Sequence, residues 1–466
     1  MYLYNDLEKY SSNIAIITEQ SEQISYKELL DAADSIGSRI KKRCLVFAVC
    51  RNCFESVAGY IGVMRAGAVL ALISDTIDNI LFANLLEAYK PEYIYLPAEK
   101  SGLEINCTTV FSYGSYTLLK TDCNIDYTLH DDLALLLSTS GSTGSQKFVR
   151  QSYRNINSNA EAIVRYLEIT SVDRSITTMP MSYTYKLSII NSHLLQGASI
   201  ILTEATLMDR CFWETIKENN TTTFGGVPYV YEMLKKLRFG QMNLPHLKYI
   251  TQAGGKLSRE LSVEFADICK QRGMRFYTMY GQTEATARMS YLPWEYARTK
   301  AGSIGIAIPG GEFWLEDEKG NVIEKSDTQG ELVYKGDNVT LGYAVSCLDL
   351  CKGDENGGIL CTGDVAKRDT EGFYYIVGRK KRFLKMFGNR VSLDEIEQLV
   401  RAAGHDCACA GTDDNMKIYV TTLDDKDWIR RYITKCTGIN QSGFAFVHIE
   451  EIPRNESGKV LYSALN

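Results

Sequence analysis

Short apolar runs and amphipathic segments alternate along the first 300 residues of the chain. Apolar runs at residues 44–50, 68–73 and 93–96 predict buried strands, and residues 54–65 and 77–89 between them have patterns typical of helices. The alternation returns later in the chain, with strands predicted at residues 199–202 and 249–250 and a helix at 230–237. Strands that alternate with helices in this way predict parallel β-α-β units with helices on both faces of a sheet.

The pattern changes after about residue 300, where short strand-like segments are separated by glycines. This spacing predicts a small antiparallel or barrel-like subdomain over about residues 300–377. A strand predicted at residues 374–377 leads into a basic run, and a helix start of the capping-box type follows at Ser392 to Glu395.

We therefore expect an α/β protein with a large domain and a small one. The expected parts are a large N-terminal domain of stacked doubly wound sheets with the barrel-like subdomain (1–377), a hinge (378–382) and a small mobile α+β C-terminal lid domain (383–466).

Composition narrows the choice of partners and compartment. The chain has 466 residues, of which 45% are hydrophobic and 23% charged, and these values are typical of a globular protein with more than one domain. A net charge of −6 gives no electrostatic reason to expect nucleic acid or an anionic membrane as partner. No apolar run approaches the length of about 20 residues that spans a bilayer, and the first residues lack the features of a secretion signal. Thirteen scattered cysteines without metal-ligand spacing favour a reducing cytoplasm.

One segment combines small, hydroxyl and basic residues directly after a predicted strand. It reads Ser-Thr-Ser-Gly-Ser-Thr-Gly-Ser-Gln-Lys over residues 138–147 and follows the apolar run at 133–137. Small residues let backbone N–H groups close around phosphate oxygens, and the hydroxyls and the lysine add donors and charge. The spacing is not that of the usual P-loop. A flexible linker is the alternative, but the position directly after a buried strand favours phosphate binding.

Three further short segments place reactive side chains in turns. They are Tyr280 to Glu284, Thr362 to Asp364, and Ser457 to Lys459. Each of them alone favours a simpler interpretation: a solvated loop, a turn or an exposed terminal lysine.

Taken together and in this order, the segments resemble those of the adenylate-forming superfamily of AMP-binding enzymes. That superfamily comprises acyl- and aryl-CoA synthetases, the adenylation domains of peptide synthetases, and luciferases. The resemblance covers almost the whole chain, through residues 54–69, 138–147, 180–183, 225–228, 253–257, 280–284, 330–332, 362–364, 378–379, 388–391, 395–397 and 457–459.

The resemblance implies an ATP- and Mg²⁺-dependent ligase. A carboxylic acid would attack the α-phosphorus of ATP, and the acyl group would then pass to the pantetheine thiol of coenzyme A or of a carrier protein that binds in trans. One alternative delivers the acyl group to an amine or an alcohol. Another is a catalytically silent homologue that only binds nucleotide.

The resemblance also implies a role for each motif residue. Glu284 would bind Mg²⁺, Thr283 would contact the α-phosphate, and Tyr280 would stack on adenine. Asp364 would accept hydrogen bonds from the ribose hydroxyls, and Lys459 would bring the substrate carboxylate and the α-phosphate together. The remaining ATP- or AMP-binding residues would be Thr139, Ser140, Gly141, Ser142, Thr143, Gly144, Lys147, Gly254, Gly255, Lys256, Gly281 and Arg379.

Two positions would serve the second half-reaction, in which the small domain turns. Lys381 aligns with the hinge residue of the family, and Gly388 would line the channel for the pantetheine arm. Arg382 stands where the family has an acidic residue, Gln146 replaces a proline of the phosphate loop, and Thr278 replaces a polar residue that usually meets adenine.

The acid pocket is expected around Tyr183, Lys186, Gly225 and Pro228. Residues 180–187 resemble the corresponding segment of acyl and aryl synthetases, and they contain no acidic residue that could pair with the ammonium of a free α-amino acid. Lys186 either neutralises a second acidic group of the substrate or extends to solvent. We favour the second, because a lysine readily keeps its charge in water.

Overall fold

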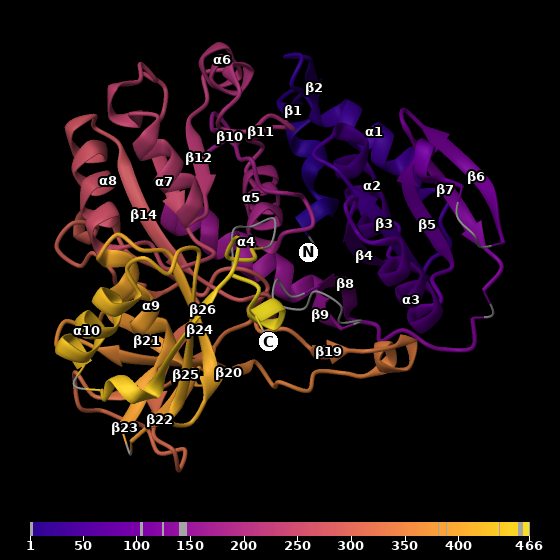
Figure 1. Cartoon of the computed structure of the whole chain (residues 1–466). Helices are drawn as coiled ribbons and strands as arrows, with labels where there is room; N and C mark the ends of the chain where they lie inside the picture. Colours follow the sequence, from indigo (N-terminus) through magenta and orange to yellow (C-terminus); the bar gives the residue numbers. More distant parts are fainter. Residues whose placement is uncertain are drawn as a thin grey trace.

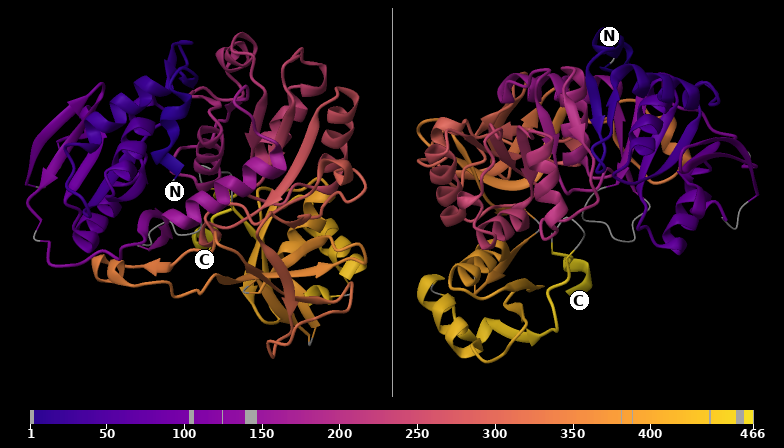
Figure 2. Two further views of the ribbon diagram at one scale, coloured as in Figure 1. Left: turned by 180° about the vertical axis from the view of Figure 1, so that it is seen from behind. Right: turned by 90° about the horizontal axis from the view of Figure 1, so that it is seen from above.

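The computed structural model describes residues 3–102, 106–123, 125–138, 147–380, 382–387, 389–437, 439–454 and 460–465. Two large sheets and their helices form most of the molecule (Figure 1). The indigo-to-purple first sheet lies on one side, and the magenta-to-red second sheet lies on the other. Figure 2 shows the same arrangement from behind and from above.

The first sheet has a parallel centre with antiparallel strands on both sides of it. Its central parallel strands are largely apolar along their length. Such strands are buried on both faces, and every residue of β3 is buried. Within the described residues, the order of its strands is β19 (Gly342–Ala344), β9 (Phe148–Ser152), β8 (Leu133–Ser138), β4 (Val69–Ser74), β3 (Leu45–Cys50), β5 (Tyr93–Pro97), β7 (Tyr116–Thr121) and β6 (Cys107–Tyr113). The helices that accompany it are α1 (Tyr26–Gly37), α2 (Phe54–Arg65) and α3 (Asn79–Tyr89).

Helices α1 and α2 pack closely because glycines stand where they cross. A Cβ atom on Gly62 would lie 2.3 Å from the carbonyl oxygen of Ala33, and one on Gly37 would lie 2.6 Å from the carbonyl oxygen of Gly62. The start of α1 is fixed by a capping box between Ser25 and Glu28.

The second sheet repeats the β-α-β arrangement. In the part of the chain that the structure describes, its order is β16 (Ile306–Ala307), β15 (Ser290–Tyr291), β14 (Arg275–Tyr280), β13 (Tyr249–Gln252), β12 (Thr223–Gly226), β10 (Arg174–Ile176), β11 (Ser199–Ile201), β1 (Ile14–Ile17) and β2 (Gln23–Ser25). Its helices are α4 (Tyr153–Leu167), α5 (Thr184–Leu195), α6 (Arg210–Glu218), α7 (Pro228–Lys236) and α8 (Arg259–Gln271). One continuous apolar core contains residues of both large sheets and of the helices between them. The predicted β-α-β alternation is therefore confirmed.

The third sheet is antiparallel, as the glycine-rich region after residue 300 predicts. Its order is β17 (Glu312–Glu316), β18 (Gln329–Lys335), β20 (Ile359–Arg368) and β21 (Tyr374–Arg379). The strand predicted at residues 374–377 thus continues through Gly378 and Arg379. One segment of this region leaves the sheet, because β19 pairs antiparallel with β9 of the first sheet.

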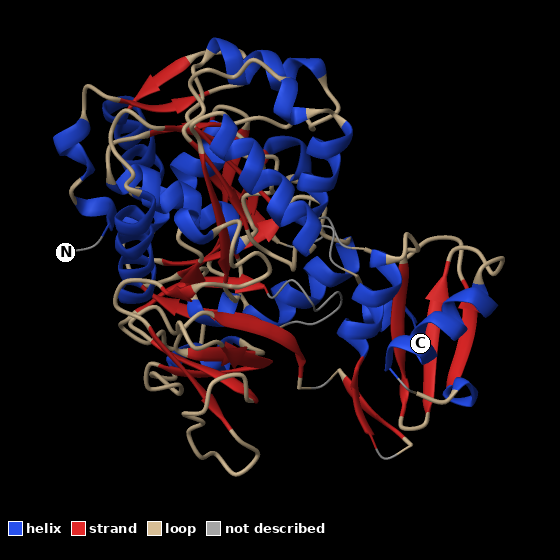
Figure 3. Cartoon of the chain, turned by 90° about the vertical axis from the view of Figure 1, so that its left-hand side faces the viewer, coloured by secondary structure: helices blue, strands red, loops and turns tan. Residues whose placement is uncertain are grey.

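The last part of the chain forms a small α+β unit that is set apart from the large sheets in Figure 3. It contains β22 (Phe383–Met386), β23 (Asn389–Ser392), α9 (Leu393–Ala402), β24 (Cys407–Thr412), β25 (Asn415–Val420), α10 (Lys426–Thr437) and β26 (Phe444–His448), with its own apolar core. Helix α9 begins directly after Ser392, where the sequence predicts a helix start.

Short 3-10 turns complete the description. They are η1 (Leu3–Asn5), η2 (Leu7–Tyr10), η3 (Ala98–Lys100), η4 (Phe239–Gln241), η5 (Thr283–Ala285), η6 (Trp294–Tyr296), η7 (Cys347–Cys351), η8 (Gln441–Gly443) and η9 (Tyr462–Leu465). Among the described residues, no helix has both the length and the apolar composition needed to cross a membrane.

Candidate active site

The site is organised by the tight turn that follows β14. A Cβ atom on Gly281 would lie 1.7 Å from the carbonyl oxygen of Ala287, so only glycine fits there. The close approach brings the backbone of Ala287, just after η5, against the turn that follows β14. Tyr280 is the last residue of β14 before the turn, and Thr283 and Glu284 open η5 after it.

On the side of Tyr280 lies a buried carboxylate, that of Asp364 on β20. Its Oδ2 atom accepts hydrogen bonds from Tyr280 Oη over 2.5 Å and from Gln282 Nε2 over 3.0 Å. Arg379 Nε on β21 lies 3.4 Å from Oδ1, because Asp364 and Arg379 are paired in the strand register. Asp364 is only 4% exposed, and this burial raises its pKa, against the opposing effects of Arg379, Tyr280 and Gln282.

On the other side of the turn, Glu284 lies at the edge of the first sheet. Tyr343 Oη on β19 donates a hydrogen bond to Glu284 Oε1 over 2.7 Å. Lys147 Nζ lies 3.1 Å from the centroid of the Tyr343 ring, a cation–π contact. Lys147 closes the predicted phosphate loop, which joins the antiparallel strands β8 and β9. The site thus has a carboxylate and a lysine at the end where phosphates are expected.

A third group of predicted residues gathers around the glycines after β13. Gly254 has φ +84°, and a Cβ atom there would lie 2.5 Å from Tyr183 Oη. A Cβ atom on Gly255 would lie 3.0 Å from Pro228 Cγ. Burial raises the pKa of Tyr183 to about 12, so its phenol stays protonated at neutral pH.

Two more predicted residues have clear positions in this region. Gly225 lies in β12, one residue before its end, and its Cβ position is 3.1 Å from the side-chain oxygen of Thr251 and 3.3 Å from that of Tyr185. Lys256 Nζ donates a hydrogen bond to the carbonyl oxygen of Ile376 on β21 over 3.2 Å. The structure therefore brings those predicted nucleotide and acid-pocket residues of the large domain that it describes into one region.

Lys186 does not extend to solvent, so the favoured interpretation of this residue is wrong. It is 1% exposed on α5, and its Nζ atom has no hydrogen-bond partner among the described residues. Burial lowers its pKa to about 7, and this effect is partly offset by Cys50, Cys53 and Glu204. Helix α5 packs inside the protein, so the lysine stem has no route to the surface. Whether Lys186 meets a substrate stays a prediction.

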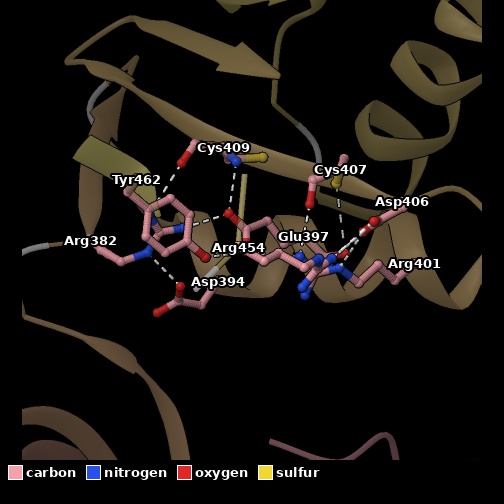
Figure 4. A network of polar contacts seen from close by, with 9 residues as sticks. All are labelled: Arg382, Asp394, Glu397, Arg401, Asp406, Cys407, Cys409, Arg454 and Tyr462. Carbon is pink, nitrogen blue, oxygen red and sulfur yellow. Dashed lines mark hydrogen bonds and ion pairs between the residues drawn. The ribbon is translucent and has the colours of Figure 1, made fainter. Parts of the chain in front are cut away.

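Figure 4 shows a network of charged residues around Glu397 on α9 in the small domain. Glu397 accepts hydrogen bonds from Arg382 Nη2 over 2.6 Å, from the backbone N–H of Cys409 over 2.7 Å, and from Tyr462 Oη over 2.8 Å. Arg382 also donates to Asp394 over 2.5 Å, and its guanidinium carbon lies 3.6 Å from the centroid of the Tyr462 ring. Burial raises the pKa of Glu397 in spite of these partners.

The same network holds the chain on both sides of residues 455–459. Before them, Arg454 forms an ion pair with Asp406 over 2.9 Å, and after them Tyr462 bonds to Glu397. Arg454 and Val460 also form an isolated β-bridge. Arg382, which follows the predicted hinge residue, is therefore linked to both flanks of the segment that contains Lys459.

Some predicted site residues lie outside the described residues. They are Thr139, Ser140, Gly141, Ser142, Thr143 and Gly144 of the phosphate loop, Lys381, Gly388 and Lys459. Their roles stay predictions.

The structure adds two residues to the predicted site. Gln282 lies within the Tyr280 to Glu284 motif, so its place there could have suggested its contact with Asp364. Tyr343 could not be found in this way, because it is one of 29 tyrosines and lies far along the chain from Glu284. Only the pairing of β19 with β9 brings it to the site. No group of three or more His, Cys, Asp or Glu side chains that could hold a metal ion occurs in the described part of the chain.

Comparison with known proteins gives consistent matches. The model of the family described as AMP-binding enzyme matches residues 3–344. A 2-succinylbenzoate–CoA ligase of Geobacillus sp. (strain WCH70) is 28% identical over 353 residues, which are 71% of this chain and 68% of the relative. An oxalate–CoA ligase of Arabidopsis thaliana is 25% identical over 427 residues, 85% of this chain and 82% of the relative.

Solved structures match the fold over the whole length. The O-succinylbenzoate coenzyme A synthetase of Bacillus subtilis in complex with AMP has a TM-score of 0.81 at 20% identity, covering 100% of this chain and 98% of that chain. The ATP-bound MatB of Rhodopseudomonas palustris has a TM-score of 0.78 at 21% identity, with 100% and 98% covered. The buried carboxylate, the tight turn after β14 and the match over residues 3–344 lead to one conclusion: the chain belongs to the family of AMP-binding enzymes.

Proposed function

We propose that this protein is an ATP- and Mg²⁺-dependent acid–thiol ligase. It joins a carboxylic acid to AMP, releases pyrophosphate, and transfers the acyl group to the thiol of coenzyme A. The observation that carries the proposal is the turn at Gly281, which sets Asp364 at one end of a single site and Glu284 with Lys147 at the other. Relatives that are named CoA ligases support the acceptor.

The end of the site at Asp364 suits a nucleoside. A buried carboxylate held by Tyr280 and Gln282 can accept hydrogen bonds from ribose hydroxyls. The Gly254–Gly255 backbone and the Tyr280 ring would lie against adenine, with Lys256 and Arg379 beside them. Because the two donors already orient the carboxylate, binding costs little rearrangement.

The end of the site at Glu284 suits Mg²⁺ and phosphates. Mg²⁺ is commonly held in proteins by one or two carboxylates together with substrate phosphates. Tyr343 occupies Oε1 of Glu284, and no hydrogen bond to Oε2 occurs among the described residues, so a carboxylate oxygen remains for the metal. The residues therefore fit the ion, which would offset the charge that develops on the pyrophosphate leaving group. A solved structure of the Bacillus subtilis synthetase contains ATP and a magnesium ion.

Three further roles belong to the proposal. Thr283 would contact the α-phosphate, the loop from Thr139 to Lys147 would hold the β- and γ-phosphates, and Lys459 would bring the acid and the α-phosphate together. The small domain would turn about Lys381 between the half-reactions, so that the loop with Gly388 lines a channel for pantetheine.

The acid would enter beside Tyr183, Gly225 and Pro228. The relatives' names cover 2-succinylbenzoate, oxalate and a medium-chain fatty acid, so they do not single out one acid. A carrier protein that presents a pantetheine arm in trans is an alternative acceptor to coenzyme A.

Pyrophosphate release across a panel of aliphatic, aromatic and hydroxy acids tests the adenylation step. Acids that release pyrophosphate are then offered coenzyme A or a pantetheine-loaded carrier protein, and the products are identified by mass. We expect ATP- and Mg²⁺-dependent pyrophosphate release with a restricted set of acids and a thioester with coenzyme A. ATP binding without pyrophosphate release for any acid would contradict the proposal. An amide or ester product would contradict the thiol acceptor.

A further inference from the structure

Arg288 is a buried cation beside the candidate active site. It follows η5 and is 2% exposed. Its Nε atom donates to Ser188 Oγ over 3.1 Å, and Nη1 donates to Tyr166 Oη over 3.0 Å. Nη1 also lies 3.3 Å from the sulfur of Met279, and the guanidinium carbon lies 5.2 Å from the centroid of the Tyr185 ring.

These partners are all neutral. No carboxylate among the described residues forms an ion pair with Arg288. Its Nη2 atom donates no hydrogen bond to any described residue. The charge of Arg288 acts on the buried side chains of Tyr166, Tyr185 and His193, and burial keeps the pKa of His193 low, at about 4. The guanidinium is always charged, so its burial leaves a positive charge without a counter-charge.

Two other arginines with little exposed side chain are compensated differently. Arg150, with no exposed surface, forms an ion pair with Glu355 over 2.5 Å. Arg382 pairs with both Asp394 and Glu397. Both of these guanidinium groups meet a carboxylate of the chain itself, whereas Arg288 does not.

Arg288 lies next to the place where the acid would bind. It belongs to the same short segment as Thr283 and Glu284. Its partner Ser188 lines a small pocket together with Thr184, Leu187, Thr286 and Ala287. Thr184 is the first residue of α5, directly after Tyr183 of the predicted acid pocket.

We propose that Arg288 binds a second anionic group of the substrate, so that the preferred acid is a dicarboxylic acid. One carboxylate is adenylated, and the other pairs with the guanidinium through the donors that the protein leaves free. This inference rests on the proposed function. Arginine and carboxylate form short, charge-assisted hydrogen bonds with matching geometry, so the fit is specific. A monocarboxylic acid of the same length would leave the buried charge unpaired and bind poorly.

The test compares matched acids by kcat/KM for pyrophosphate release. The pairs are glutarate with pentanoate, and 3-carboxyphenylacetate with phenylacetate. They are tested on wild type, Arg288→Gln and Arg288→Lys. Arg275→Gln is the control. It also removes a positive charge from the large domain, but Arg275 is partly exposed and paired with Glu168. Binding is followed independently by the rise of the melting temperature when each acid is added in the presence of AMP.

We expect wild type and Arg275→Gln to prefer a dicarboxylic acid by about 100-fold or more. Arg288→Gln should lower kcat/KM for the dicarboxylic acid by a similar factor and leave the monocarboxylic acid unchanged or improved. Arg288→Lys should keep part of the preference. The dicarboxylic acid should raise the melting temperature of wild type but not that of Arg288→Gln.

Four results would overturn the inference. The first is an equal kcat/KM of wild type for both acids of a pair. The second is an equal fall of kcat/KM for both acids in Arg288→Gln, as expected of a purely structural residue. A loss of the preference in Lys186→Met but not in Arg288→Gln would assign the second anion to Lys186 instead. If Arg288→Gln does not fold, the wild type alone decides: an equal rise of its melting temperature with both acids of a pair overturns the inference. Pyrophosphate release with none of the acids is a different failure, because it contradicts the proposed function itself.

Discussion

Tyr343 Oη donates a hydrogen bond to Glu284 Oε1 over 2.7 Å, while Lys147 Nζ lies 3.1 Å from the centroid of the same tyrosine ring. One side chain therefore positions both a carboxylate and a lysine of the candidate phosphate end. Burial and the charge of Glu284 raise the pKa of Tyr343 well above its ordinary value. The phenol consequently remains a hydrogen-bond donor throughout the neutral pH range.

Replacing Tyr343 by phenylalanine should weaken the use of Mg²⁺. The variant keeps the ring under Lys147 and removes only the donor to Glu284. A hydrogen bond to a charged group contributes about 1.5–3 kcal/mol, so the Mg²⁺ concentration for half-maximal pyrophosphate release should rise about tenfold or more. Tyr296→Phe, at an exposed position on η6, is the control. An unchanged Mg²⁺ dependence of Tyr343→Phe would contradict this role.

Gly281→Ala should disrupt the site and destabilise the large domain. The added methyl group would have to occupy a position 1.7 Å from the carbonyl oxygen of Ala287, and the backbone must shift to admit it. Such overpacking costs about 1–3 kcal/mol, which we expect as a lower melting temperature together with loss of pyrophosphate release. In the matched variant Gly240→Ala the nearest atom lies 3.4 Å away, so its melting temperature should stay close to wild type. Normal activity of Gly281→Ala would show that the turn is not needed.

The sequence allowed most of the fold and part of the site to be predicted. The buried parallel strands and the helices between them follow from local patterns, and the helix predicted at residues 54–65 is α2 itself. The departure of β19 from the third sheet could not be predicted, because it depends on pairing with β9, a strand distant in the sequence. That pairing is what brings Tyr343 to Glu284.

Whether a charged side chain is buried or exposed was the feature hardest to predict from the sequence. Lys186 and Arg288 are both buried, although lysine and arginine are usually at the surface. A single charged residue within an apolar or small-residue segment gives a local pattern that fits either a pocket or the surface. Only the packing of α5 and of the segment after η5 decides between them.

Arg382→Gln should destabilise the small domain more than the large one. The change leaves buried Glu397 with only the longer ion pair to Arg401 at 3.6 Å, and breaking a buried ion pair costs up to about 3–5 kcal/mol. Because Tyr462 and Arg454 belong to the same network, adenylate formation should fall as well. Arg430→Gln, which removes a pair with Asp427 at 3.5 Å and a contact 5.3 Å from the centroid of the Phe446 ring, is the control. Urea unfolding and limited proteolysis would measure the effect, and equal stability of the two variants would contradict it.

Lys459→Ala should separate the two half-reactions. We expect adenylate formation to fall by a large factor, since no other group would then draw the acid and the α-phosphate together. Transfer from a chemically supplied acyl-adenylate to coenzyme A should change much less. Single-turnover measurements of each step distinguish these results, and an equal loss in both would argue against the role.

Lys186→Met should stabilise the protein in a pH-dependent way. The pKa of Lys186 is lowered from 10.5 to about 7 in the folded state, so the unfolded chain binds more protons between these values. The free energy of unfolding of wild type should therefore rise with pH over this interval, and the full penalty of the lysine applies below it. The gain in the methionine variant should be largest below pH 7, up to about 5 kcal/mol, and should shrink toward pH 10.5. Urea unfolding at both ends of the interval measures it, and a gain that does not vary with pH would contradict the assignment.

The side chain of Arg150 joins distant parts of the chain. It bonds to the carbonyl oxygens of Leu341, Tyr343, Lys352 and Gly353 and to Glu355. The stretch from Leu341 to Glu355 is therefore fastened to β9, although it follows β17 and β18 in the sequence. This sets where the protein can be cut and recombined with a relative. A chimera that exchanges everything after residue 300 would separate Arg150 from its partners, whereas a junction after β21 keeps the Arg150 contacts within one parent.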